Sequence, residues 1–163
     1  MSFRQDSTLH ATWARKGHQP LIPVTGARKS IKIFGSVELR SARFLYQRAK
    51  VFNSDTYINY LERLARYYYP QPVYQIQDNA SYHKKKEVWA WFNENRSWWT
   101  VYNLPPYSPE FNAAEPIWHH VRIEGTHNRY FVDEHELLST LTRVFRSIQR
   151  NPDQIAGYLQ PFL

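Results

Sequence analysis

Apolar and polar residues alternate in the first part of the chain, with the period that strands show. The run KSIKIFGSVEL alternates Ile31 and Ile33 with Lys32 and Phe34, and the run RFLYQRA follows it after a short turn. A period of two is typical of a strand with one face on a core. The pattern therefore predicts an antiparallel hairpin near the start of the chain.

The rest of the chain alternates between helical spacing and short apolar runs. Asp133 and Glu136 form the sequence signature of a capping box at the start of the longest amphipathic run. A strand, a helix and a second strand in succession favour parallel pairing of the two strands. The predicted elements after the hairpin are helices at 54–69, 83–95, 115–121, from 133 and from 151, and strands at 73–77 and 98–104.

These elements predict one mixed α/β domain over residues 1–163. Its central sheet would begin antiparallel, gain parallel strands and be flanked by helices. A chain of 163 residues is long enough to bury one sizeable core, and no repeat or linker divides it.

Composition narrows the classes of function. The net charge of +7 indicates nucleic acid as a partner, although a role in solubility is the alternative. The absence of cysteine excludes disulfides, thiolate catalysis and cysteine-ligated zinc. No apolar run reaches the ~20 residues of a membrane span, and the first residues do not form a secretory signal, so we expect a cytoplasmic protein without a membrane partner.

Basic residues cluster in the predicted hairpin and again after Asp78. On a hairpin they would follow DNA phosphates, or they would form a solvated, charged sheet edge. Lys84 and Lys85 stand where a helix dipole disfavours cations, which favours phosphate contact. The basic residues of the hairpin region are Arg28, Lys29, Lys32, Arg40, Arg43, Arg48 and Lys50.

Three carboxylates stand at the ends of predicted elements. Asp6 follows the run SFRQ, Asp78 follows VYQIQ, and Glu115 follows a proline-rich turn. If the two runs are neighbouring strands, their carboxylates meet at one edge of the sheet. Such a cluster is relieved by divalent cations, and two Mg²⁺ ions about 4 Å apart would serve a phosphodiester displacement.

Each carboxylate also has an ordinary interpretation. Asp6 would be a solvated acid near a terminus, and Asp78 would close a strand by turn chemistry. Glu115 would belong to a capping box opened by Asn112. Pro116 argues against this last interpretation, because proline lacks the N–H that would close the first helical turn. A helix that begins at or just before Glu115 is the better prediction.

Two motifs carry a resemblance to a known family. The block QDNASYH follows a predicted strand, and the block LPPYSPEFNAAEPIW places Glu115 after 36 intervening residues from Asp78. With the stretches TWARKG and THNRYFVDEHELL, they make the chain resemble, over nearly its whole length, the catalytic domain of DDE transposases. The similarity is to the mariner-like and related bacterial insertion-sequence type, which has a ribonuclease H-like fold.

The resemblance implies a role for each motif residue. Asp6, Asp78 and Glu115 would bind two Mg²⁺ or Mn²⁺ ions in an enzyme that cuts DNA at transposon ends. The freed 3′-hydroxyl would then attack a target phosphodiester. The residues expected to support the site are Asn79, His83 and Asn112, and those expected to shape the turn before Glu115 are Tyr107 and Ser108.

The resemblance also implies partners and a setting. We expect transposon-end and target DNA as partners, a homodimer, and a bacterial, nucleoid-associated location. The family's helix-turn-helix domains are expected to be absent, because the chain begins only five residues before Asp6. Ser7 and Ala113 depart from the family pattern. Two alternatives stay open, a structure-selective nuclease that does not join strands and an inactive DNA-binding remnant.

Overall fold

The computed structural model describes residues 1–6 and 8–163, so Ser7 lies outside the described residues. Its strands form two hydrogen-bonded groups. The first is an antiparallel sheet of β1 (Ser2–Arg4), β2 (Ser30–Val37) and β3 (Phe44–Ala49). The second is a parallel pair of β4 (Val73–Gln77) and β5 (Trp99–Asn103). The predicted hairpin and the predicted parallel pair are both confirmed.

β1 and β4 are not hydrogen-bonded neighbours within the described part of the chain. β1 pairs only with β2, through Phe3 opposite Ile31, and β4 pairs only with β5. For Asp6 and Asp78 to meet as the sequence predicts, β1 and β4 would have to be neighbouring strands. This pairing does not provide that condition.

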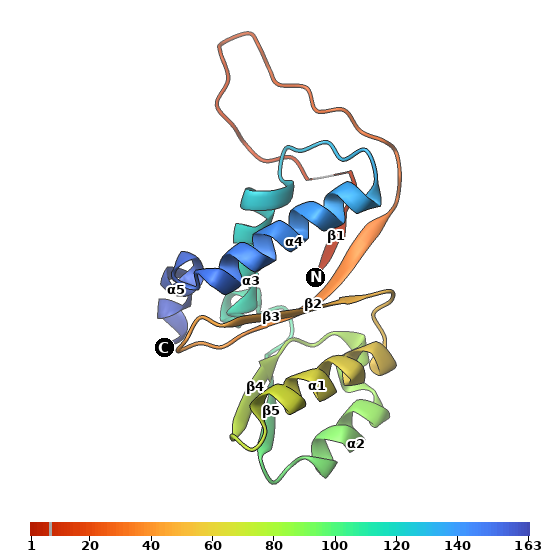
Figure 1. Cartoon of the computed structure of the whole chain (residues 1–163), viewed down its shortest axis with the longest axis vertical. Helices are drawn as coiled ribbons and strands as arrows, with labels where there is room; N and C mark the ends of the chain where they lie inside the picture. The colour runs from red at the N-terminus through yellow and green to blue at the C-terminus, as the bar shows by residue number, and fades with distance from the viewer. Residues whose placement is uncertain (7) are drawn as a thin grey trace.

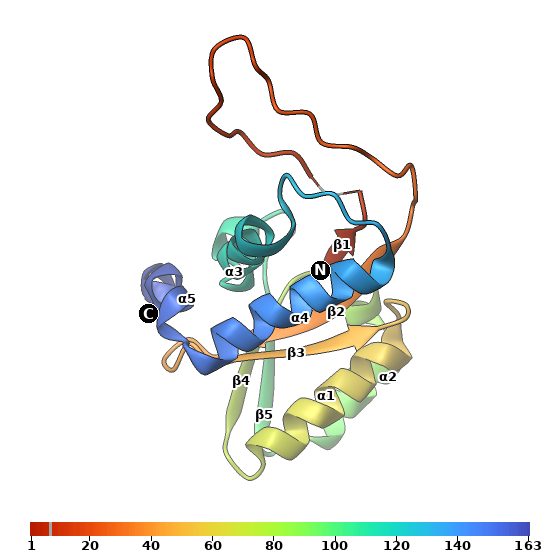
Figure 2. The ribbon, with the colours of Figure 1, turned by 45° about the horizontal axis from the view of Figure 1, so that its top comes forward.

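Helices cover the antiparallel sheet on both faces (Figures 1 and 2). The helices of one layer are α1 (Ser54–Tyr68) and α2 (Lys86–Glu94). The helices of the other layer are α3 (Ala114–Val121), α4 (Glu134–Arg150) and α5 (Asp153–Leu159). The result is a mixed α/β domain with one apolar cluster on each side of the sheet.

β2 is buried on both faces, which its sequence pattern did not indicate. Ile31 and Ile33 pack in the cluster that contains the buried face of α4. Phe34, expected on the polar face, is only 5% exposed and stacks on Tyr60 of α1 at 5.5 Å between ring centroids. The simple alternation failed here because a second helical layer covers the face that would otherwise meet water.

The ends of the helices follow the sequence signals with local differences. The helix expected from His83 begins with a separate 3₁₀ turn, Ser81–Lys84, because Lys85 has an extended backbone. Asp133 caps α4 as predicted, while the Glu136 carboxylate accepts from the N–H of Val132. A π-helical turn, Arg122–Thr126, follows α3 and was not predicted.

A long irregular segment, residues 8–29, projects from one end of the molecule (Figure 1). Its base is tied to the turn after the π-helix. The backbone N–H of His10 donates to Oδ1 of Asn128 at 2.8 Å, and Oγ1 of Thr8 lies 3.1 Å from Nδ1 of His127. Further out the segment is open to solvent, and the side chain of Trp13 is fully exposed.

Gly35 marks the closest approach between β2 and α3, and Gly35→Ala is expected to destabilise the fold. An added Cβ would lie 2.3 Å from the Trp118 ring and 3.3 Å from Phe44. Overpacking of this kind costs about 1–3 kcal/mol. Urea unfolding measures the loss, with Gly157→Ala as the control.

The control probes the same change of residue without a clash. Gly157 lies inside α5 with nothing within 4 Å of an added Cβ. Alanine there is expected to be neutral or to stabilise the fold by up to about 1 kcal/mol, because glycine is a poor helix former. Equal effects of the two substitutions would contradict the close approach at Gly35.

None of the helices in residues 1–6 and 8–163 combines the length and the apolar character that crossing a membrane requires.

Candidate functional site

Asp78 follows β4 directly, and its carboxylate is held by its own loop. Oδ1 accepts the backbone N–H of Ala80 at 3.0 Å and lies 3.1 Å from Nδ1 of His83. The hydrogen bond from His83 lowers the pKa of Asp78, burial opposes this, and the Ala80 N–H and the Met1 ammonium add to the lowering. The carboxylate is thus kept ionised, the form in which it binds a cation.

His83 is fixed as a hydrogen-bond donor towards Asp78. Its Nδ1 lies 2.9 Å from the main-chain oxygen of Asp78 as well as near the carboxylate, and both oxygens can only accept. Nδ1 therefore carries the hydrogen. The ring is buried and packs on Tyr57 at 4.3 Å between centroids. His83 acts here as a support that orients the Asp78 loop.

A polar network lies behind His83 in an otherwise apolar layer. The Tyr57 hydroxyl donates to Oε1 of Gln77 at 2.5 Å, and the side-chain amide of Gln77 donates to Oδ1 of Asn103 at 2.8 Å. Burial raises the pKa of Tyr57, so its hydroxyl stays protonated. Sequence analysis missed these residues, because Tyr57 stands at a helical core position with no motif around it.

Asn79 joins the Asp78 loop to the start of the proline-rich turn. Its side-chain amide donates to the carbonyl of Leu104, and the N–H of Leu104 donates to the carbonyl of Gln77 at 2.8 Å. The ends of β4 and β5 are therefore locked together. Movement of one motif relative to the other is restricted at this point.

Glu115 lies in the first turn of α3, as the sequence predicted. Oδ1 of Asn112 accepts the N–H of Ala114 at 3.1 Å, and the carbonyl of Asn112 accepts the N–H of Glu115 at 2.9 Å. The preceding turn holds Tyr107 in the left-handed region, with φ of 57°, which is strained for a residue with a Cβ. Asn112 and this turn determine where α3 begins.

The Met1 amine interacts electrostatically with both Asp78 and Glu115. Burial lowers the pKa of this amine to about 6, and the charges of Asp78 and Glu115 oppose that shift. The amine also donates to the carbonyl of Ile33 at 2.8 Å. Two of the three predicted carboxylates therefore interact electrostatically with the amine at the start of β1.

Asp6 lies at the other end of β1. Its Oδ1 accepts both the backbone N–H and the hydroxyl of Thr25, each at 2.7 Å, and these bonds lower the pKa of Asp6. β1 spans only Ser2–Arg4, and Asp6 follows it in a bend. In this structure Asp6 is held by Thr25, while Asp78 is held by Ala80 and His83.

The donor set at Asp78 and Glu115 fits a hard divalent cation in part. Carboxylate oxygens are the ligands that Mg²⁺ and Mn²⁺ prefer, and both carboxylates interact electrostatically with the Met1 amine. Over residues 1–6 and 8–163, however, no group of three His, Asp or Glu side chains is arranged to hold a metal ion. The arrangement amounts to two carboxylate ligands without a third.

The predicted DNA-binding residues divide between the two ends of the antiparallel sheet. Lys29 lies beside Gln5, at the Asp6 end, where its carbonyl accepts the Gln5 N–H at 3.0 Å. Arg40 and Arg43 lie in the β2–β3 turn at the far end, where Arg43 contacts Glu38 at 3.5 Å. The remaining predicted contacts are Arg28 and Lys32 near the Asp6 end and Lys84 and Lys85 after the Asp78 loop.

Comparison with protein families gives a match over most of the chain. A family model described as DDE superfamily endonuclease matches residues 1–138. This range includes Asp6, Asp78 and Glu115 together with both sequence motifs. No curated protein matches the sequence.

Solved structures with the same fold are Mos1 complexes. The Mos1 strand transfer complex has a TM-score of 0.65 at 13% identity, covering 98% of this chain and 50% of that chain. The Mos1 transposase paired-end complex with the left transposon end has a TM-score of 0.65 at 14% identity, covering 98% of this chain and 51% of that chain. The Mos1 mariner paired-end complex with Mn has a TM-score of 0.61 at 14% identity, covering 94% of this chain and 49% of that chain.

The chain therefore spans about half the length of these solved chains. At this level of identity the similarity concerns the fold. It confirms the predicted ribonuclease H-like class, with its antiparallel strands, parallel pair and flanking helices.

Proposed function

Because the chain belongs to the DDE superfamily of endonucleases, we propose that it is a transposase catalytic domain that cuts DNA at transposon ends and joins the freed 3′-hydroxyl to target DNA. The observation that carries the proposal is the family match over residues 1–138, which includes Asp78 and Glu115, together with the Asp78 carboxylate held by Ala80 and His83 at the end of β4. The similarity to Mos1 complexes with transposon ends supports DNA as the substrate.

The residues around this pair have distinct proposed roles. Asp78 and Glu115 would hold the divalent ions, Mg²⁺ or Mn²⁺ in a two-ion site, and bound ions would supply Lewis-acid stabilisation of the attacking and leaving oxygens. His83 orients and keeps ionised the Asp78 carboxylate. Asn79 locks the two motifs together, and Asn112 sets the helix start that carries Glu115.

The proposed DNA contacts fall into a set near the carboxylates and a set far from them. Lys84 and Lys85 follow the Asp78 loop and are exposed. Arg28, Lys29 and Lys32 lie at the end of the antiparallel sheet where Asp6 is found. Arg40 and Arg43 lie in the β2–β3 turn at the opposite end, so they would contact a different part of the DNA. Binding of two ends by a homodimer is part of the same proposal.

The proposal is tested with the purified protein and a supercoiled plasmid. We expect nicking that requires Mg²⁺ or Mn²⁺ and stops when the metal is chelated. A duplex with a pre-cut 3′-hydroxyl, supplied beside the plasmid, should give joined products. Nicking without joining would favour the structure-selective nuclease.

An inactive DNA-binding remnant is distinguished by thermal unfolding. A ligand at about 100 times its Kd stabilises a protein by about 2.7 kcal/mol. The proposal expects a rise in Tm with Mn²⁺. DNA binding that weakens with salt, without this rise and without nicking, would favour the remnant.

Asp6 enters the proposal on the sequence motif alone, because it is bound to Thr25 in this structure. If Asp6 leaves Thr25 to complete the site, Asp6→Asn should lower nicking at least 100-fold, while Thr25→Ala should leave it within about threefold. Plasmid nicking rates measure both.

Asp6 and Thr25 could instead only anchor the base of the 8–29 segment to each other. Both substitutions would then have similar and small effects on nicking. That result would remove Asp6 from the site.

A further inference from the structure

The outward face of α4 carries three arginines. Arg143, Arg146 and Arg150 are spaced three and four residues apart, so they share one stripe of the helix. The apolar residues of α4 lie on the opposite face, in the apolar cluster that also contains Ile31 and Ile33 of β2. All three arginines are exposed.

No acidic partner balances this stripe. Within the described residues, Arg143, Arg146 and Arg150 make no carboxylate contact, whereas Arg43 contacts Glu38 and Arg48 contacts Glu134. The helical neighbours of Arg143 and Arg146, three or four residues away, include no Asp or Glu. Arg150 is favoured by the negative end of the helix dipole, but that effect falls off within the last turn. The stripe therefore concentrates uncompensated positive charge.

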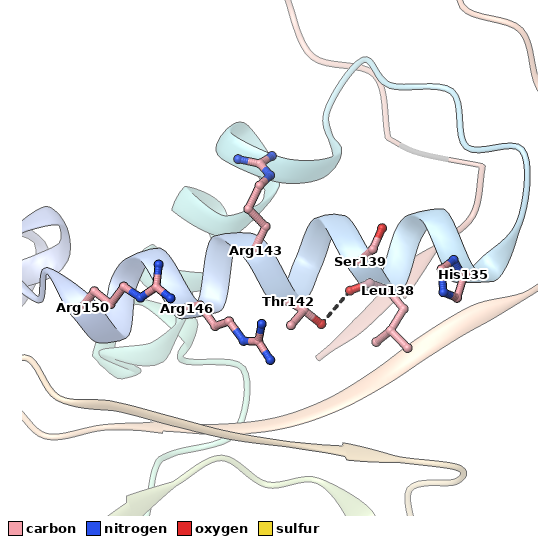
Figure 3. A pocket seen from close by; sticks show the side chains of 7 residues that line it. All are labelled: His135, Leu138, Ser139, Thr142, Arg143, Arg146 and Arg150. Atoms are coloured by element: carbon pink, nitrogen blue, oxygen red, sulfur yellow. Dashed lines mark hydrogen bonds between the residues drawn. The ribbon is translucent and has the colours of Figure 1, made fainter.

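The arginines border a hollow of about 440 Å³ along α4 (Figure 3). Ser139 and Thr142 add hydroxyl oxygens to it, and each hydroxyl already donates to a carbonyl one turn earlier. Figure 3 shows Arg143 extending above the helix and Arg146 below it, with Arg150 lying across the ribbon near the end of α4. Guanidinium groups are thus spread around an open surface instead of closing on a single point.

The spacing fits a row of phosphates. Seven residues of helix separate Arg143 from Arg150, a rise of about 10 Å. Each strand of a duplex carries one phosphate per about 3.4 Å of the duplex axis, so about three phosphates of one strand fall within that length. Guanidinium groups are the side chains best suited to phosphate oxygens.

We propose that this arginine stripe of α4, Arg143, Arg146 and Arg150, binds the phosphate backbone of duplex DNA. The surface is separate from the Asp78–Glu115 pair, because no residue of that pair or of its supports lines the hollow. It lies towards the β2–β3 turn, where Gln149 donates to the carbonyl of Phe44 at 3.0 Å. The stripe would hold a stretch of DNA at a distance from the phosphodiester that is cut.

The inference goes beyond the proposed function, and its test does not require cleavage. Binding of a labelled duplex of arbitrary sequence is measured by fluorescence anisotropy in EDTA, over about 50 to 200 mM salt. The variant combines Arg143→Gln with Arg146→Gln, since glutamine keeps the helix propensity and removes the charge. The slope of log K against log salt should become shallower by about 1.8, at about 0.9 per phosphate contact.

The matched control combines Arg66→Gln with Arg96→Gln, which removes two exposed charges from the α1 and α2 layer. Its slope should stay within about 0.5 of the unchanged protein. Equal changes in the two variants would show that only total charge matters, and no change in the α4 variant would show that this face does not meet DNA. Either result overturns the inference while leaving the nicking assay, and thus the proposed function, to stand or fall separately.

Discussion

Asp78→Asn is expected to lower metal-dependent nicking by on the order of 10³-fold or more, equivalent to about 4 kcal/mol of transition-state stabilisation. Asp78 directly follows β4, and its pKa is lowered by the hydrogen bond from His83, so its charge is available to a metal. Asparagine retains an oxygen that can accept from Ala80 and His83 but loses the negative charge. Nicking of a supercoiled plasmid at saturating Mn²⁺ measures the effect.

A matched substitution separates the loss of charge at this position from a general loss of charge. Asp55 lies exposed in the first turn of α1, away from both motifs, and Asp55→Asn removes the same charge. It should leave nicking within about twofold, and both variants should keep Tm within a few degrees of the unchanged protein. Activity of Asp78→Asn equal to that of Asp55→Asn would remove Asp78 from the chemistry.

Local elements were predictable because the information that specifies them is local. The β2–β3 hairpin, the β4–β5 pair and the start of α3 follow from periodicity, proline positions and capping residues within a few positions of each element. Pro116 alone was enough to place the helix start just before Glu115. Such signals do not depend on what the rest of the chain covers.

Long-range placement was not predictable from the same signals. Whether Phe34 meets water depends on α1, and whether Asp6 meets Asp78 depends on the pairing and register of strands far apart in the sequence. The residues around Asp6 predict its chemistry, but they do not determine where Asp6 lies relative to Asp78. The Asp6–Thr25 bonds likewise join two positions that no pattern connects.

The arginine stripe shows a signal that was present and unused. The period of the apolar residues predicts the apolar face of α4 and carries no information on what the opposite face binds. Three arginines at helical spacing, two of them with no acid three or four residues away, are readable from sequence alone. What the structure adds is that this face is exposed and borders a hollow.

Trp118→Ala is expected to cost about 3–5 kcal/mol of stability, a large part of the total for a domain of this size. The Trp118 side chain is 5% exposed and lies edge-on to Phe3 and Phe44, at 6.2 and 5.7 Å between ring centroids. It fills the space over Gly35, so its removal leaves a cavity between α3 and the sheet. Urea unfolding measures the loss directly.

The same substitution should also affect the site, because Trp118 anchors the helix that carries Glu115 one turn earlier. The rise in Tm that Mn²⁺ produces should be smaller for this variant than for the unchanged protein. Trp13→Ala is the control, since that side chain is fully exposed and its loss should change stability by no more than about 0.5 kcal/mol. A Trp118→Ala variant as stable as Trp13→Ala would contradict the packing of α3 on β2, and with it the support proposed for Glu115.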